Sequence, residues 1–193
     1  MSKDSPSDSQ PLSMETTLDL MLALLYAPGK TRVVGESIEG ITRLQKFLFL
    51  LQQGKGPKTL VAQAKEYIYR PFKMGPFSEG VREDLQILQS AGLLRTEKLE
   101  YLLTDDADKS LDELDRPVRP NPRRVESSRF ILTEDGMRAG RDLWAGMPSH
   151  ERDGLAEFKK FFNALTLRQL LIFVYEKYPE YAVASEIKEQ LGL

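Results

Sequence analysis

The sequence has 193 residues, of which 41% are hydrophobic and 29% are charged, a composition typical of one globular domain with a sizeable core. It contains no cysteine and a single histidine, His150, so a disulfide framework and thiol catalysis are excluded and zinc lacks its usual ligands. The net charge of −2 argues against a uniformly basic surface. DNA binding therefore requires that the charges be segregated along the chain.

The charges are indeed segregated. Between residues 54 and 73 five cations face one acid, Glu66, and a second basic group lies between 116 and 129, beyond an acidic run at 97–115. The first group is Lys55, Lys58, Lys65, Arg70 and Lys73, and the second is Arg116, Arg119, Arg123, Arg124 and Arg129. Both groups are candidates for contact with phosphate.

The N-terminal part of the chain predicts a tail followed by a helix. Residues 1–12 are rich in Ser, Asp and Pro, and we expect them to be disordered. They contain no apolar run, and the run at Leu20–Tyr26 is too short to span a bilayer, so we expect neither a signal peptide nor a membrane helix, and a cytoplasmic protein. Apolar residues at helical spacing predict a helix from Ser13 to about Ala27.

The next loop contains Gly29-Lys30-Thr31, the last three positions of a phosphate-binding loop motif. That motif requires a glycine where Leu24 stands and a strand before the loop. We therefore expect no nucleotide here and no cofactor elsewhere. Asp105, Asp106 and Asp108 could form a calcium site by their spacing, but they lack the glycine and the distal glutamate of a calcium loop, so we do not expect calcium there.

A second helix is predicted at Gly40–Gln53, apolar enough to be mostly buried and to support a recognition helix. The alternative for its first turn is that Thr42 and Arg43 contact a backbone phosphate. A short helix at Thr59–Ala64 and extended chain at Glu66–Phe72 follow.

The stretch from Pro71 to Leu94 predicts a capped amphipathic helix behind a rigid turn at Gly75-Pro76. The hydroxyl of Ser78 is expected to cap the helix, and Gly92 to end it with positive φ. Val81, Leu85 and Leu88 fall on one face, which we assign to the core. The opposite face is Glu79, Arg82, Glu83, Gln86 and Gln89.

Two strands are expected after this helix, at Leu93–Leu103 and Ser127–Leu132, and together they form a wing. The connection at 104–126 is long for a hairpin, which favours a charged insertion. Its proline-rich arginine segment, with Arg119, Arg123 and Arg124, suits an arm along a phosphate backbone or in a minor groove. The alternative is a solvated loop whose acidic half folds against its basic half.

Helices are predicted from Thr133 to about Trp144, from Ser149 onward with the apolar residues Leu155, Phe158, Phe161 and Phe162, and from Thr166 to Tyr178. A last short helix is expected to be capped by Ser185. The apolar surface of the late helices either completes the core or forms a dimer interface, and we expect a symmetric homodimer.

Four segments, in this order along the chain, resemble those of a known family. They are Gly40-Ile41-Thr42-Arg43-Leu44-Gln45-Lys46, Gly75-Pro76-Phe77-Ser78, Phe130-Ile131-Leu132-Thr133 with Gly136, and Val174-Tyr175-Glu176-Lys177-Tyr178-Pro179-Glu180-Tyr181. They resemble winged helix-turn-helix proteins of the bacterial and archaeal YwgA type and, more loosely, Panacea-type antitoxins. The resemblance runs from about Met14 to the C-terminus. It implies a mainly α fold with a small β-wing, a winged helix-turn-helix domain at 13–147, and a helical extension at 148–193 packed on the same domain.

Two functions remain open at this point. The first is a winged-helix protein that binds double-stranded DNA, as a transcriptional regulator or a DNA-recognising component of a larger system. The second is a protein-interaction module such as an antitoxin-like or adaptor protein, which the acidic run favours. An enzyme is not expected, since no nucleophile and base pair or metal cluster stands out. The predicted DNA contacts are Arg82, Gln86, Gln89, Arg119, Arg123, Arg124, Lys73 and Arg43.

Overall fold

The computed structural model describes residues 14–102 and 124–193. This part of the chain is mainly helical with a small antiparallel sheet, as the sequence predicts. The elements in chain order are α1 (Thr17–Tyr26), β1 (Ile38–Glu39), α2 (Ile41–Gln52), η1 (Lys58–Leu60), α3 (Val61–Ala64), β2 (Arg70–Phe72), β3 (Gly75–Phe77), α4 (Glu79–Ser90), β4 (Leu94–Leu102), β5 (Arg124–Leu132), α5 (Glu134–Gly146), α6 (Ser149–Ala164), α7 (Leu167–Lys177), η3 (Pro179–Tyr181) and α8 (Lys188–Leu191).

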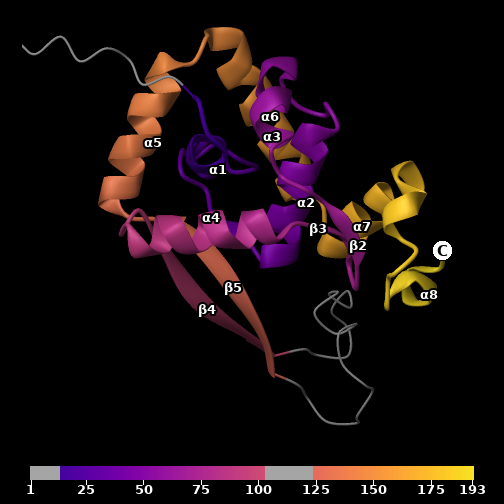
Figure 1. Cartoon of the computed structure of the whole chain (residues 1–193). Helices are drawn as coiled ribbons and strands as arrows, with labels where there is room; N and C mark the ends of the chain where they lie inside the picture. Colours follow the sequence, from indigo (N-terminus) through magenta and orange to yellow (C-terminus); the bar gives the residue numbers. More distant parts are fainter. Residues whose placement is uncertain (1–13, 103–123) are drawn as a thin grey trace, which may run out of the picture.

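Helix α1 lies at the centre of a ring formed by α2, α3, α4, α5 and α6 (Figure 1). Its residues from Leu20 to Tyr26 are all buried, which is typical of a helix that is apolar on every side. The helix begins at Thr17 and not at Ser13, because Thr16 and Asp19 form a reciprocal capping box that fixes its start. The tail prediction for residues 1–12 lies outside the described residues.

The main sheet has three strands in the order β1-β5-β4, all antiparallel. Strands β4 and β5 form the predicted hairpin, with Leu94 opposite Leu132 and Glu97 opposite Arg129. Strand β5 begins at Arg124, three residues before the predicted start at Ser127. The two-residue strand β1 was not predicted, because its pairing depends on β5, far away in the sequence.

A second, two-stranded sheet joins β2 and β3. Its turn lies at Lys73-Met74 and not at Gly75-Pro76 as predicted, because Pro76 is inside β3 and faces Pro71 across the hairpin. Gly75 does have the predicted positive φ, +88°, and a Cβ there would lie 2.6 Å from the ring of Tyr175. Both conditions exclude a larger residue at this position.

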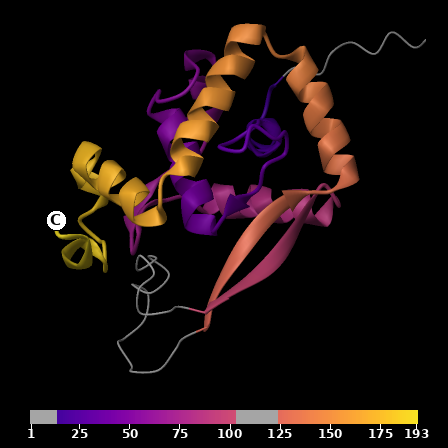
Figure 2. The ribbon, with the colours of Figure 1, turned by 180° about the vertical axis from the view of Figure 1, so that it is seen from behind.

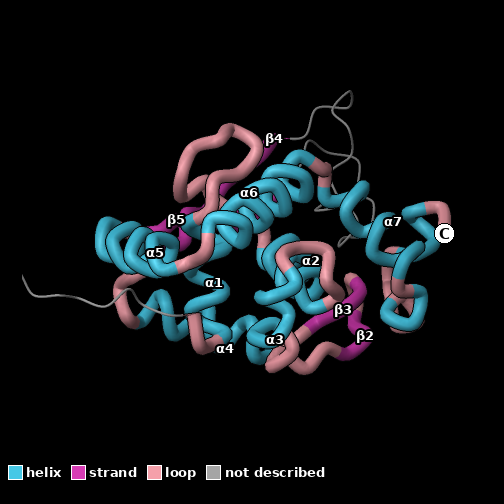
Figure 3. The backbone as a smooth tube through the Cα atoms, turned by 90° about the horizontal axis from the view of Figure 1, so that it is seen from above, coloured by secondary structure: helices cyan, strands magenta, loops and turns pink. Residues whose placement is uncertain are grey.

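The late helices close the fold around α1. Figure 2, the view from behind, shows α6 passing beside α1, between α5 and α7, and Figure 3, from above, shows α5, α6 and α7 in the same order. Thr133 and Thr166 cap α5 and α7 through their side chains, as predicted. The rings of Phe158 and Phe162 pack against Phe47 of α2. The buried side chains from α1 to α8 therefore form one core cluster.

Phe161 is 57% exposed, so of the two roles left open for the apolar side chains of the late helices it does not complete the core. One prediction in this region was wrong. Ser185 was expected to cap the last helix, but α8 begins two residues later with Ile187 as its N-cap residue. The Ser185 hydroxyl instead forms a hydrogen bond of 2.9 Å with the hydroxyl of Tyr175 and accepts one from the Ile187 N–H.

Candidate nucleic-acid interface

The start of α4 is held by a glutamine of α2. Gln45 Nε2 donates to the Ser78 carbonyl at 2.8 Å, and Gln45 Oε1 accepts from the Ser78 N–H at 3.0 Å. Ser78 is the N-cap residue of α4, but its hydroxyl makes no capping bond, so that prediction was wrong. Because both residues are buried, the Gln45 amide satisfies the Ser78 backbone where water cannot.

The next residue of α2 holds the hairpin. Lys46 is buried and its ammonium donates to the Pro76 carbonyl in β3 at 2.9 Å. Burial lowers the pKa of Lys46 to about 7, because a charge inside the core loses its hydration. Two consecutive polar side chains of α2 thus fix both β3 and the first residue of α4.

The inner face of α4 is as predicted. Val81, Leu85 and Leu88 are buried. Asp84 of the same helix is buried as well and accepts a hydrogen bond of 2.7 Å from the Tyr67 hydroxyl. Burial, followed by the contact with Asp84, raises the pKa of Tyr67. One acid of α4 is therefore turned inward and adds no charge to the outer face of the helix.

The outer face of α4 is polar with one apolar exception. Arg82 and Gln86 are exposed, as their spacing predicts, and Arg82 lies 3.6 Å from Glu79 in an ion pair along the helix. Gln89 is partly buried and its amide donates to the Thr96 hydroxyl on β4, so it ties the helix to the sheet. Ile87 is 50% exposed between these polar residues. Arg82 and Gln86 remain the candidates for contact with bases.

The other predicted contacts are scattered. Arg43 donates to the carbonyls of Phe162 and Leu165, at 3.2 and 2.8 Å, and so satisfies the C-terminal end of α6. Lys73 lies at the tip of the β2–β3 hairpin and pairs with Glu186 at 3.1 Å. Arg124 is the first residue of β5. Arg119 and Arg123 lie outside the described residues, as do the acidic run beyond residue 102 and the alternative arm and loop interpretations.

The two hairpins that flank α4 differ in charge pairing. On the β4–β5 side, Arg95 pairs with Glu97, and Arg129 pairs with Glu39 of β1 at 2.8 Å. On the β2–β3 side, Arg70 is exposed and its guanidinium lies over the rings of Phe72 and Phe77, 5.0 and 5.5 Å from their centroids. Arg70 has no carboxylate partner within residues 14–102 and 124–193.

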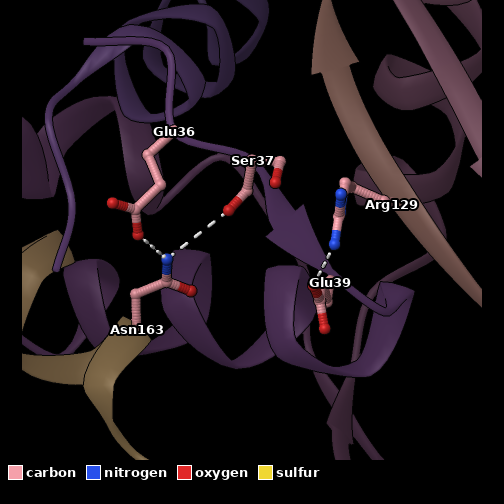
Figure 4. A network of polar contacts seen from close by, with 5 residues as sticks. All are labelled: Glu36, Ser37, Glu39, Arg129 and Asn163. Atoms are coloured by element: carbon pink, nitrogen blue, oxygen red, sulfur yellow. Dashed lines mark hydrogen bonds and ion pairs between the residues drawn. The ribbon is translucent and has the colours of Figure 1, made fainter. Parts of the chain in front are cut away.

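The Gly29-Lys30-Thr31 loop binds an internal carboxylate. Glu36 accepts hydrogen bonds from the N–H groups of Lys30 and Thr31, at 3.1 and 2.6 Å, and from the Thr31 hydroxyl. The Asn163 amide of α6 also donates to it (Figure 4). Burial opposes the charge of Glu36, but these hydrogen bonds outweigh it and lower its pKa. The amides that would cradle a phosphate are occupied by the chain itself.

A buried lysine binds the C-terminal end of α1, next to this loop. Lys159 of α6 donates to the carbonyls of Leu25 and Ala27 at the C-terminal end of α1, at 2.8 and 2.7 Å. Burial lowers its pKa to about 7, and the charge of Glu36 partly offsets that shift. Sequence analysis missed this residue as well as Gln45, Lys46 and Asn163. Only Lys46 carried a signal, a lysine directly before the apolar run from Phe47 to Leu51.

Within the described ranges, no three acidic or histidine side chains gather closely enough to bind a metal ion. His150 is exposed in the first turn of α6. Across those ranges no helix combines the length and the apolar character that crossing a membrane demands. Comparison of the chain with known protein families, with curated proteins and with solved structures finds no match in any of the three.

Proposed function

We propose that the chain is a winged-helix protein that binds double-stranded DNA, with α4 as its recognition helix and β4–β5 as its wing. The observation that carries the proposal is the sequence of elements around α4: an exposed polar face with Arg82 and Gln86, a turn at Gly92, and then a two-stranded hairpin. Side chains of these types bind guanine and adenine edges in the major groove.

The order of elements supports the same class. Strand β1 lies between α1 and α2 in the chain and pairs with β5, so one sheet combines an early strand with the two wing strands. One feature departs from a simple helix-turn-helix unit. Residues 53–78, which contain η1, α3 and the β2–β3 hairpin, replace the short turn between α2 and α4.

The test is a binding titration on duplex DNA over a series of salt concentrations. A protein that neutralises phosphates must lose affinity steeply with salt, with a slope of about −0.9 for each phosphate contact. We expect a linear decrease in log K with log salt concentration. Absence of binding at low salt would overturn the proposal.

A protein partner is the second candidate, and one observation favours it. Ile87 is 50% exposed on the outer face of α4, beside an open hollow lined by Glu83, Gln86, Ser90 and Ala91. An apolar side chain in the middle of a polar helix suits a protein interface better than a DNA groove. If this candidate is correct, Ile87→Ser weakens capture of the partner and leaves DNA affinity unchanged.

We also propose a homodimer, a non-enzymatic role and a cytoplasmic location. The support for a dimer is a hollow of about 560 Å³ beside the exposed Phe161, lined by Pro57, Phe158, Phe162 and Phe173 among others. A two-fold axis at this site would bury the phenylalanine of both copies. Sedimentation at micromolar concentration is expected to show a dimer, and Phe161→Ser a monomer.

A further inference from the structure

We propose that the β2–β3 hairpin is a second DNA-contacting element, which binds the phosphate backbone beside the segment contacted by α4. We define the basic hairpin as residues 65–77, which carry the exposed cations Lys65, Arg70 and Lys73 and one acid, Glu66. This inference deepens the proposed DNA binding and rests on it. It assigns a function to the segment that replaces the turn between α2 and α4.

The position of the basic hairpin is the first support. Phe77 ends β3, Ser78 is the N-cap residue of α4, and α4 ends where the loop to β4 begins, so the two hairpins flank opposite ends of α4. Figure 1 shows both hairpins pointing to the same side of α4. A duplex that lies along α4 and touches the wing therefore passes the tip of the basic hairpin.

The charge of the basic hairpin is the second support. In the described part of the chain neither Lys65 nor Arg70 has an ion-pair partner; on the β4–β5 side Arg95 and Arg129 are paired, and of the exposed cations there Lys98 is left without one. An unpaired exposed cation releases no carboxylate when it binds phosphate, so its charge is available to the backbone. The near-neutral total of the chain conceals this local excess.

The geometry of Arg70 is the third support. The rings of Phe72 and Phe77, tilted by 38° with centroids 5.0 Å apart, both contact its guanidinium. Contact with two rings restricts the side chain, and no hydrogen bond or ion pair within residues 14–102 and 124–193 occupies its N–H groups, so they are available to phosphate oxygens with little loss of side-chain entropy. The hairpin itself is fixed from beneath by Gln45 and Lys46.

An exposed apolar residue lies beside these cations. Ile68 is 86% exposed between Lys65 and Arg70. Proteins that contact the minor groove combine cations with such exposed apolar side chains, which pack against sugars or base steps. Lys73 at the tip is held by Glu186, whose N–H also donates to the Lys73 carbonyl at 3.0 Å. This acid competes with phosphate for the third cation.

The experiment compares salt slopes for the full-length chain and its variants on one duplex. Lys65→Gln with Arg70→Gln should reduce the slope by about 2, one unit for each lost phosphate contact, with the helical content unchanged. Glu186→Gln should tighten binding by about twofold to fivefold, because it frees Lys73. The control, Arg138→Gln with Arg141→Gln on the exposed face of α5, removes the same charge far from the hairpin and should leave the slope unchanged.

The outcomes separate this inference from the proposed function. If the wild-type chain binds and Gln86→Ala weakens specific binding, but the double hairpin variant keeps the wild-type slope, the inference is overturned and α4 keeps its role. An equal loss of slope in the α5 control overturns it too, because the effect would then reflect total charge. If the wild-type chain does not bind DNA at any salt concentration, the proposed function fails and the inference fails with it.

Discussion

The two hairpins beside α4 achieve their positions by opposite means. The β4–β5 hairpin is long; Arg95 pairs with Glu97 of the same strand and Arg129 with Glu39 of β1, while Lys98 of β4 is exposed without an ion pair among the described residues. The β2–β3 hairpin is short and is anchored by buried polar side chains of α2, with its cations left at the surface. A two-stranded ribbon of this length is not stable by itself, so the anchor must supply its order.

This difference predicts which substitutions in each hairpin lower the stability of the fold. Surface ion pairs contribute little to stability, so the β4–β5 hairpin should tolerate loss of its charges. A buried amide with two backbone partners has no replacement in water, so the short hairpin should depend strongly on Gln45 and Lys46. Each prediction below tests one side of this contrast.

The largest effect is expected from raising the pH. It acts through buried lysines such as Lys46, whose ammonium binds the Pro76 carbonyl of the β2–β3 hairpin. The pKa of Lys46 is lowered to about 7 in the folded chain, and that of Lys159 likewise, so between about pH 7 and the ordinary lysine pKa the unfolded chain binds more protons. The free energy of unfolding should therefore rise with pH in this window, by at most about 1.4 kcal/mol per pH unit for each lysine. Urea titrations at pH 7 to 9 measure it.

Lys46→Met should remove about half of that rise and leave the share of Lys159. Lys177, exposed in the last turn of α7, provides the control, since Lys177→Met changes no buried charge and should keep the full pH dependence. A stability that is flat from pH 7 to 9 in the wild-type chain would contradict the burial of both ammonium groups.

The second prediction breaks the anchor. Gln45→Ala leaves the Ser78 N–H and carbonyl buried without partners, at a cost of about 3 kcal/mol in the free energy of unfolding. The matched control is Gln86→Ala on the exposed face of α4, which should cost less than about 0.5 kcal/mol. Chemical denaturation of both variants decides the matter, and equal losses would mean that the Gln45 contacts do not hold the hairpin.

The third prediction concerns binding at α4. Gln86→Ala should weaken binding to the preferred DNA site by about 1–3 kcal/mol and change binding to unrelated DNA little, because only a base contact depends on sequence. Titrations on both duplexes measure the difference. Equal losses on both would reduce Gln86 to a backbone contact.

The smallest effect is expected from a substitution in the β4–β5 hairpin. Arg95→Gln removes an exposed ion pair with Glu97 and should change the free energy of unfolding by less than about 0.5 kcal/mol. Its effect on the salt slope should also be smaller than that of Arg70→Gln, since Arg95 is already paired. A larger change of the salt slope for Arg95→Gln than for Arg70→Gln would mean that the β4–β5 hairpin contributes more phosphate contacts than the β2–β3 hairpin, contrary to this prediction.

The sequence predicted the features that depend on near neighbours. The caps at Thr133 and Thr166, the buried face of α4 and the positive φ of Gly75 and Gly92 all follow from residues within a few positions. It failed where a partner is remote. Gln45 meets Ser78 across 33 positions and Arg43 meets Phe162 across 119, and no local pattern indicates either pair.

The candidate site shows the same division. The spacing of Val81, Leu85 and Leu88 correctly left Arg82 and Gln86 exposed. It could not show that the Arg43 guanidinium is used by α6, since that depends on where the end of α6 is packed. The orientation of Asp84 follows likewise from Tyr67, whose position is set by tertiary packing.

The most direct test of the account is amide hydrogen exchange of the full chain with and without duplex DNA at low salt. The account predicts new protection in two stretches, the basic hairpin at residues 65–77 and α4 at Glu79–Ser90, and none attributable to DNA in α6 around Phe161. Protection that is confined to α6 and α7, or no change anywhere when DNA is added, would contradict it.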